Sequence, residues 1–293
     1  MNKCIICDNQ FQKLNEYVYK CNQCEFLKSD LKPGFGREIE GISDVRKNNF
    51  KRIIKKIKSL DSKDIKILEI GSGNGFFIEE CNKAEIDITG SEADEEQLVL
   101  LKKKFNKIIH LSLPFDASTN NLDNTFDYII FNDVFEHLQN LELVLSQLKL
   151  ILNDKGKIVL NLPSSDGLIF KICNLLRKFG ITKFYDRLWQ RGLSSPHLSY
   201  FNSQNLSKFV CKNGYKQIYA SSLITVSRNK NFERLNSTIK NKLICHFLSY
   251  FLFLFYYFQK ILPKDIIFHI YKKTNTSSDW KIWENLIKSS YVR

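Results

Sequence analysis

A short apolar run, which contains the carboxylate Glu69, ends in three glycines at alternate positions: Gly71, Gly73 and Gly75. Because glycine has no Cβ, such a stretch lets the backbone approach a ligand closely at the end of a strand. The dinucleotide fingerprint needs a further glycine where this chain has Phe76, and the phosphate-binding loop of nucleotide hydrolases needs a following Gly-Lys-Ser/Thr. A carboxylate at the mouth of the loop instead favours a ligand that carries positive charge.

Four of the eight cysteines lie near the start of the chain as two Cys-x2-Cys pairs, Cys4 with Cys7 and Cys21 with Cys24. Each pair can place two thiolates on one side of a tetrahedral metal ion, and the loop between the pairs brings them together. A segment this short has too small a core to fold alone, so the metal would supply much of its folding free energy. The pattern predicts one structural zinc.

Apolar runs alternate with amphipathic stretches along the middle of the chain. They predict strands at 65–70, 86–91, 108–113, 126–132 and 157–162, followed by two paired strands at 218–226 and 266–271. Strands that are apolar nearly throughout favour a parallel sheet covered by helices on both faces. The glycines then stand at the carboxyl end of the first strand, where ligands of such sheets bind. Asp94 is expected to cap the helix that follows the second strand, with Gln97 as its capping-box partner.

The chain is predicted to divide into five parts. These are a zinc ribbon at 1–30, a linker and amphipathic helix at 31–61, an α/β core at 62–228, a hydrophobic helical insertion at 229–264, and a final strand and tail at 265–293. Pro33, Gly34 and Gly36 mark the boundary after the ribbon.

The insertion contains the apolar run 243–258, in which no Lys, Arg, Asp or Glu occurs and aromatic residues dominate. A helix that spans a membrane needs about 20 apolar residues, and a single crossing would separate the two strands that should pair across the insertion. A buried helix and a homodimer interface are two alternatives. We favour a helix that lies in the interface of an anionic membrane, since lysines flank the run on both sides (Lys240, Lys242, Lys260 and Lys264).

The stretch 68–75 resembles motif I of the class I S-adenosylmethionine-dependent methyltransferases, and 126–138 resembles the signature of their fourth strand. The resemblance spans roughly residues 62–228. It implies a Rossmann-like, doubly wound and mostly parallel seven-stranded sheet with an antiparallel final strand, and S-adenosylmethionine as cofactor. It also implies a set of binding residues: Glu69, Gly71, Ser72, Gly73, Gly75, Glu92, Asp116 and Asn132. Two of these carboxylates have a physical role, because Glu69 can face the ligand's ammonium group and the two oxygens of Glu92 match neighbouring ribose hydroxyls.

Three side chains are candidates for the catalytic machinery: Asp133, His137 and His197. His137 can act as a general base or as a metal ligand together with Glu136, and the alternative is that the Glu-His pair only starts the next helix. The stretch 196–201 contains His197 and matches the His-Leu-x-x-Phe pattern of a methyltransferase subgroup. That subgroup often carries an amino-terminal zinc ribbon and acts in polysaccharide, lipid or small-molecule pathways. The resemblance implies that His197 lies on a lid loop over the substrate, and a packed structural histidine is the alternative.

The leading functional hypothesis is methyl transfer to a hydroxyl or carbon of a glycan, a nucleotide sugar or a lipid-linked precursor. The net charge of +13 and the ribbon suit RNA as an alternative acceptor, although we consider nucleic acid less favoured. The stretch 161–164 lacks a nucleophilic cysteine for methylation of pyrimidine carbon, and no Pro-Pro-aromatic motif for methylation of adenine follows the fourth strand. Without an apolar leader at Met1, the expected location is the cytoplasm, at the inner face of the membrane. A scaffold without catalysis is disfavoured by the intact glycines and Glu92.

Overall fold

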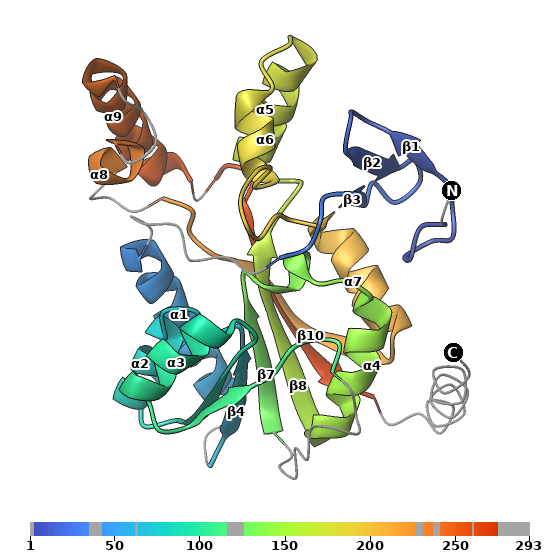
Figure 1. Cartoon of the computed structure of the whole chain (residues 1–293), viewed down its shortest axis with the longest axis vertical. Coiled ribbons are helices and arrows are strands. Elements are labelled where there is room, and N and C mark those ends of the chain that lie inside the picture. Colours follow the sequence, from blue (N-terminus) through green and yellow to red (C-terminus); the bar gives the residue numbers. More distant parts are fainter. Residues whose placement is uncertain are drawn as a thin grey trace.

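The computed structural model describes residues 3–34, 43–61, 64–115, 126–226, 231–236, 241–259 and 261–274 (Figure 1). Asp116, Gly36, Lys240 and Lys260 lie outside these residues.

A seven-stranded sheet in the order β10-β11-β8-β7-β4-β5-β6 forms the centre of the molecule. Its strands are β4 (Lys66–Ile70), β5 (Asp87–Glu92), β6 (Ile108–His110), β7 (Phe126–Asn132), β8 (Leu152–Pro163), β10 (Tyr215–Ser222) and β11 (Ile266–Lys273). Neighbours are parallel from β8 to β6, whereas β11 runs antiparallel to both β8 and β10. This arrangement confirms the predicted parallel sheet with an antiparallel final strand.

β6 and β8 differ most from their predicted lengths, and β10 begins and ends earlier than the predicted 218–226. β6 ends at His110, because its neighbour β5 ends at Glu92 and no further ladder partner is available there. β8 already begins at Leu152, before the predicted start at residue 157, and its register against β7 shifts within this added stretch.

Helices cover both faces of the sheet (Figure 1). On one face lie α1 (Ser43–Leu60), α2 (Phe76–Lys83) and α3 (Glu95–Lys104), and on the other lie α4 (Leu141–Ile151) and α7 (Ser203–Lys212). Phe50 of α1 and Phe77 of α2 share one apolar core with Ile67 of β4, whereas Leu145 of α4 shares a second core with Leu68. Successive residues of β4 therefore face opposite cores, which is why the strand is apolar at nearly every position.

A second, four-stranded sheet joins the amino-terminal segment to the main body. It contains β1 (Phe11–Lys13), β2 (Val18–Cys21), β3 (Leu27–Ser29) and β9 (Ser199–Tyr200), in that order. Because β9 comes from the middle of the chain, the predicted ribbon does not stand alone but shares its sheet with the methyltransferase-like part.

Four further helices project beyond the carboxyl end of the main sheet (Figure 1). These are α5 (Leu168–Lys178), α6 (Lys183–Leu188), α8 (Asn231–Asn236) and α9 (Lys242–Phe258). The helices α8 and α9 form the predicted insertion between the paired strands β10 and β11. Within the described ranges, none of the helices has both the length and the apolar character needed to cross a membrane.

Candidate functional site

A cavity of about 820 Å³ lies at the carboxyl ends of β4, β5 and β7. It is of the size that small-molecule and cofactor sites in proteins usually have. The structure brings eight of the predicted site residues together in its wall: Glu69, Gly71, Ser72, Gly73, Glu92, Asn132, Asp133 and His137. Pro33 and Gly34 of the linker also line the cavity.

The glycine loop needs left-handed backbone conformations at Gly71 (φ 67°), Gly73 (φ 50°) and Gly75 (φ 79°). A Cβ on Gly71 would come within 2.9 Å of the Val134 side chain, and one on Gly75 would overlap the ring of Phe105. A Cβ on Gly73 would meet no atom within 4 Å, so this position faces open space. Gly71 and Gly75 thus permit local packing, and Gly73 is the position where a ligand can touch the backbone.

Hydrogen bonds hold both the amide and the carbonyl group of Gly73. The Glu92 Oε2 atom accepts from Gly73 N at 3.0 Å, while Oε1 accepts from Ala93 N at 2.9 Å and Asp94 N at 3.2 Å. The Gln97 Nε2 atom donates to Gly73 O at 2.6 Å. Asp94 caps α3 through the amide of Gln97, as predicted, but the Gln97 side chain holds the glycine loop rather than the cap.

A polar chain crosses the floor of the cavity from β8 to β4. Asn161 Nδ2 donates to Asn132 Oδ1 at 3.2 Å, and Asn132 Nδ2 donates to Glu69 Oε1 at 2.9 Å. Glu69 is only 2% exposed. This chain orients a buried carboxylate beside the glycine loop, where it can receive a cationic group.

Arg46 of α1 forms an ion pair with Asp133, with its Nη2 atom 3.0 Å from Oδ2. Both residues line the cavity, and Asp133 has a left-handed backbone with φ 55°. Sequence reasoning missed Arg46, because α1 reads as an amphipathic helix with a basic outer face and nothing marks one of its cations as part of a site.

His137 lies in the short 3-10 helix Phe135–His137 and contacts His197, with ring centroids 4.6 Å apart. His137 Nδ1 lies 3.0 Å from the carbonyl oxygen of Pro196, so this nitrogen carries the hydrogen and Nε2 has the free lone pair. His197 is 7% exposed and does not line the cavity. It lies behind His137, outside the cavity wall, with the side-chain amide of Gln190 at 2.9 Å from its Nε2 atom.

Glu136 is the third side chain of this cluster. It is fully buried, and neither carboxylate oxygen has a hydrogen-bond partner within the described part of the chain. Its Oε1 atom lies 3.9 Å from His197 Nε2. One ligand atom from each of Glu136, His137 and His197 lies within 4.8 Å of the others, so the three side chains are close enough to hold one metal ion.

Burial biases the whole cluster toward its neutral forms. It raises the pKa of the Glu136 carboxyl well above its ordinary value, and the charge of Asp133 adds to that effect. It lowers the pKa of His137, and it lowers the pKa of His197 further still, with the neighbouring His137 contributing. His137 therefore offers an uncharged imidazole to the cavity near neutral pH.

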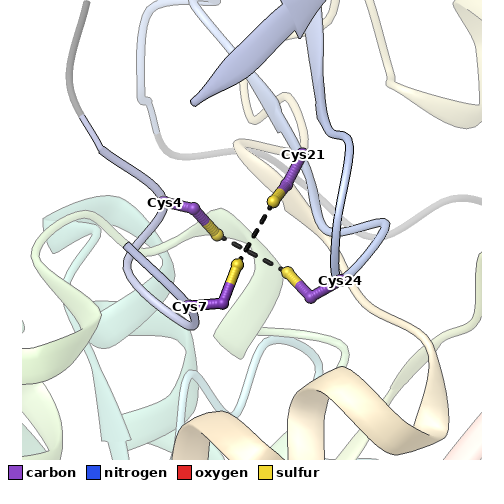
Figure 2. A group of neighbouring side chains, drawn as sticks. All are labelled: Cys4, Cys7, Cys21 and Cys24. Carbon is purple, nitrogen blue, oxygen red and sulfur yellow. Dashed lines mark hydrogen bonds between the residues drawn. The ribbon is translucent and has the colours of Figure 1, made fainter. Parts of the chain in front are cut away.

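The four amino-terminal cysteines converge on one point (Figure 2). Their Sγ atoms lie within 4.8 Å of one another, with 3.6 Å between Cys4 and Cys24 and 3.4 Å between Cys7 and Cys21. A tetrahedral ion with sulfur ligands at about 2.3 Å requires separations of about 3.8 Å, so the cluster fits zinc. All four cysteines are free thiols rather than disulfides.

The residue after each Cys-x2-Cys pair turns the chain in the same way. Asp8 and Glu25 both have left-handed backbones, with φ 61° and 62°. The amide of Asp8 donates to Cys4 O, and the amide of Glu25 donates to Cys21 O. The two pairs are therefore two copies of one local turn that face each other across the point where the four Sγ atoms meet.

The cysteine cluster and the histidine cluster are linked through β3 and β9. Ser29 donates to His197 O through its hydroxyl at 2.8 Å and to Leu198 O through its amide at 2.9 Å. Leu198 in turn donates its amide to Glu136 O at 2.8 Å. Phe26 packs on Phe201 with ring centroids 4.7 Å apart. The ribbon therefore holds the segment 197–201 in place behind the cavity.

Comparisons with known proteins agree with this geometry. Residues 45–220, more than half of the chain, match the family described as "Methyltransferase domain". An uncharacterized protein of Methanocaldococcus jannaschii is 33% identical over 125 residues, which span 40% of this chain and 48% of that protein.

Solved structures show the same fold. An S-adenosylmethionine-dependent methyltransferase of Archaeoglobus fulgidus superimposes with a TM-score of 0.50 at 17% identity, covering 80% of this chain and 96% of its own. A magnesium protoporphyrin IX methyltransferase of Synechocystis PCC 6803, with bound S-adenosylhomocysteine, gives 0.50 at 13% identity, covering 82% and 90%. The chain thus belongs to the methyltransferase domain family, and it shares its fold with S-adenosylmethionine-dependent methyltransferases.

Proposed function

We propose that the enzyme transfers a methyl group to a hydroxyl or carbon of a glycan, a nucleotide sugar or a lipid-linked precursor. The observation that carries the proposal is the position of His137 in the wall of the cavity that also contains the glycine loop, where burial lowers the pKa of its imidazole and favours the neutral form. Hydroxyl and carbon acceptors both have to lose a proton during methylation, and a neutral imidazole is the side chain best suited to accept it near neutral pH.

Residues on one side of the cavity have the chemistry to hold the cofactor, which when bound supplies an electrophilic methyl group on sulfur. Glu69 offers an oriented anion to the ammonium group, and Glu92 still has lone pairs for ribose hydroxyls beside its three amide donors. Gly73 leaves room for the ligand against the backbone. Asp116, which the family resemblance places near the adenine, remains a prediction.

On the other side, His137 accepts the acceptor's proton at Nε2 while the Pro196 carbonyl holds Nδ1–H. The charge of Asp133 favours the imidazolium that forms, and it is itself held by Arg46. His197 and Glu136 act behind His137, where they fix the orientation of the ring. In this proposal Asp133 and His197 position the base rather than replace it.

Transfer of tritiated methyl from S-adenosylmethionine to separated cell fractions tests the proposed acceptor class. We expect label in the lipid or the nucleotide-sugar fraction of the source cells. Label in RNA alone would overturn the proposal in favour of the RNA alternative.

A His137→Asn variant tests the proposed base, since its amide can still donate to Pro196 O but lacks a group at the Nε2 position. We expect turnover to fall by roughly 100-fold or more, with cofactor affinity by calorimetry unchanged. His246→Asn, a change at an exposed histidine of α9, is the matched control. Full turnover in His137→Asn would remove the base from the mechanism.

We also propose that Cys4, Cys7, Cys21 and Cys24 bind one structural zinc ion. The convergence of four thiols and the paired turns behind them support this assignment. In this proposal the zinc lies away from the reacting atoms and stabilises the ribbon that holds residues 197–201.

A further inference from the structure

The helix α9 exposes a continuous apolar stripe. Its exposed apolar side chains recur at helical spacing, so they share one face: Leu243, Ile244, Phe247, Tyr250, Phe251, Leu254, Tyr257 and Phe258. Leu243 is 81% and Phe247 72% exposed, whereas Cys245 and Phe255 are buried, and α9 packs against α8. The helix therefore leaves a broad apolar face uncovered, which is unusual for a surface helix.

A second apolar projection is formed by α5, α6 and the turn between them. Phe179 at the turn is 77% exposed, and Leu175, Ile181 and Phe184 beside it are also exposed. The surrounding charges are almost all positive: Lys171, Lys178, Lys183 and Arg187.

The one carboxylate of this projection, Asp186, does not balance these cations. It accepts a hydrogen bond from Tyr17 at 2.6 Å and lies 3.8 Å from Arg191, on the side of the ribbon. Within the described ranges, no carboxylate lies within ion-pair distance of Lys171, Lys178 or Lys183. The projection therefore has an apolar tip and a positively charged collar.

Both projections extend from the same end of the molecule (Figure 1). That end carries the carboxyl ends of the strands and hence the cavity. The α8–α9 insertion begins after β10 and ends before β11, and these two strands pair directly with each other. Both ends of the insertion therefore lie on the same side of any surface that α9 contacts. A helix so placed can lie along a surface but cannot pass through it.

We propose that α9 and the α5–α6 projection together form a face that binds an anionic lipid bilayer, with the cavity at the membrane surface. Apolar and aromatic side chains enter the headgroup region while the lysines contact anionic lipid. Pairing with a second copy of the chain is less favourable, because a symmetric contact would bring the same unbalanced cations together. If the proposed function holds, this placement narrows the acceptor to a lipid-linked one.

Flotation with vesicles of phosphatidylcholine, with and without phosphatidylglycerol, tests the proposal on the full chain. The wild type should float with the anionic vesicles only. A variant with Phe247→Ser, Phe251→Ser and Phe258→Ser should stay at the bottom, and one with Lys178→Gln and Lys183→Gln should bind about fivefold more weakly for each cation removed. Val99→Ser, Leu100→Ser and Leu150→Ser, three exposed apolar positions on α3 and α4, form the matched control and should float.

Calorimetry with S-adenosylmethionine shows whether each variant is folded, and its affinity should equal that of the wild type in all of them. A wild type that does not float, or that floats equally with uncharged vesicles, would overturn the proposal. A dimer in sedimentation that the α9 variant splits, without flotation of the wild type, would identify a second copy as the occupant. Failure of the proposed function would appear separately, as label in RNA or full turnover of His137→Asn with flotation intact.

Discussion

The glycine-loop side and the histidine side of the site draw their side chains from very different parts of the chain, and Glu136 and His197 of the histidine side lie behind the cavity wall. The glycine-loop side (Glu69, Gly71, Gly73, Glu92 and Gln97) comes from one uninterrupted strand-helix-strand-helix stretch. The histidine side (Arg46, Asp133, Glu136, His137 and His197) collects residues from α1, from the end of β7 and from the segment before β9. The ribbon then holds that last segment from outside.

This difference suggests a division of labour. Apart from Glu69, which Asn132 of β7 orients, the glycine-loop side is fixed by hydrogen bonds within that one stretch. It should therefore bind cofactor even when the histidine side is disturbed. The histidine side depends on contacts between distant residues and on the fold of the ribbon, so it should be the more easily disturbed. A change confined to one side should leave the other side's function in place.

The largest expected effect is on the glycine-loop side. Glu92→Ala removes the anchor of the Gly73 amide and the proposed partner of the ribose hydroxyls. Loss of two hydrogen bonds to a charged group should weaken S-adenosylmethionine binding by about 100-fold, as measured by calorimetry. Glu95→Ala, at an exposed neighbouring carboxylate, should bind like the wild type. Equal affinity in both variants would show that Glu92 does not contact the cofactor.

A change in the ribbon should impair the histidine side while leaving cofactor binding by the glycine-loop side intact. In Cys24→Ser we expect the zinc content to fall from about one per chain, and the amides of β9 to lose protection from hydrogen exchange, because this strand loses its ordered partner β3. Turnover should fall by roughly 10- to 100-fold, as when supporting contacts around a site are lost. Cofactor affinity should change by less than about threefold.

Cys211→Ser on α7 is the matched control, since this exposed cysteine lies outside the cluster. If Cys24→Ser keeps its metal, the zinc assignment is wrong. If it loses the metal but keeps the protection of β9, the ribbon does not position the histidine side.

The same division explains what the sequence could reveal. β4 and β7 were predictable because each is a single apolar run, and Gly71, Gly73 and Glu92 were predictable because they follow strand ends at fixed spacing. β9 has two residues and no pattern of its own; it exists because β3 lies beside it. Gln97 was expected to complete a local cap, but the carbonyl of Gly73 captures its side chain. Contacts between distant residues leave no local signal.

The histidine side should also show a specific dependence of stability on pH. The pKa of Glu136 is well above its ordinary value of 4.5, so between these two values the folded protein holds a proton that the unfolded chain releases. The contribution of Glu136 to the free energy of unfolding of the wild type therefore falls as the pH rises from the unfolded-state pKa to the folded-state pKa, by up to about 1.4 kcal/mol per pH unit.

Glu136→Gln removes that dependence without changing the size of the side chain. Relative to the wild type, it should gain unfolding free energy between about pH 5 and pH 7. Thermal or denaturant unfolding at the two pH values measures the difference, in which the contributions of His137 and His197 largely cancel. A difference that stays constant with pH would show that the Glu136 carboxyl titrates normally.

The smallest expected effect concerns the hydrogen bond between Gln97 and Gly73 on the glycine-loop side. Gln97→Ala removes one neutral hydrogen bond, from Nε2 to Gly73 O, but keeps the backbone amide that Asp94 caps. One such bond contributes about 1 kcal/mol, so cofactor affinity should fall by roughly fivefold while the stability of α3 changes little. Calorimetry measures the affinity, and Val99→Ala at an exposed position of the same helix serves as the control. If Gln97→Ala binds S-adenosylmethionine as tightly as the wild type, the hydrogen bond from the Gly73 amide to Glu92 is sufficient to hold the loop. The Gln97 side chain then contributes nothing to cofactor binding.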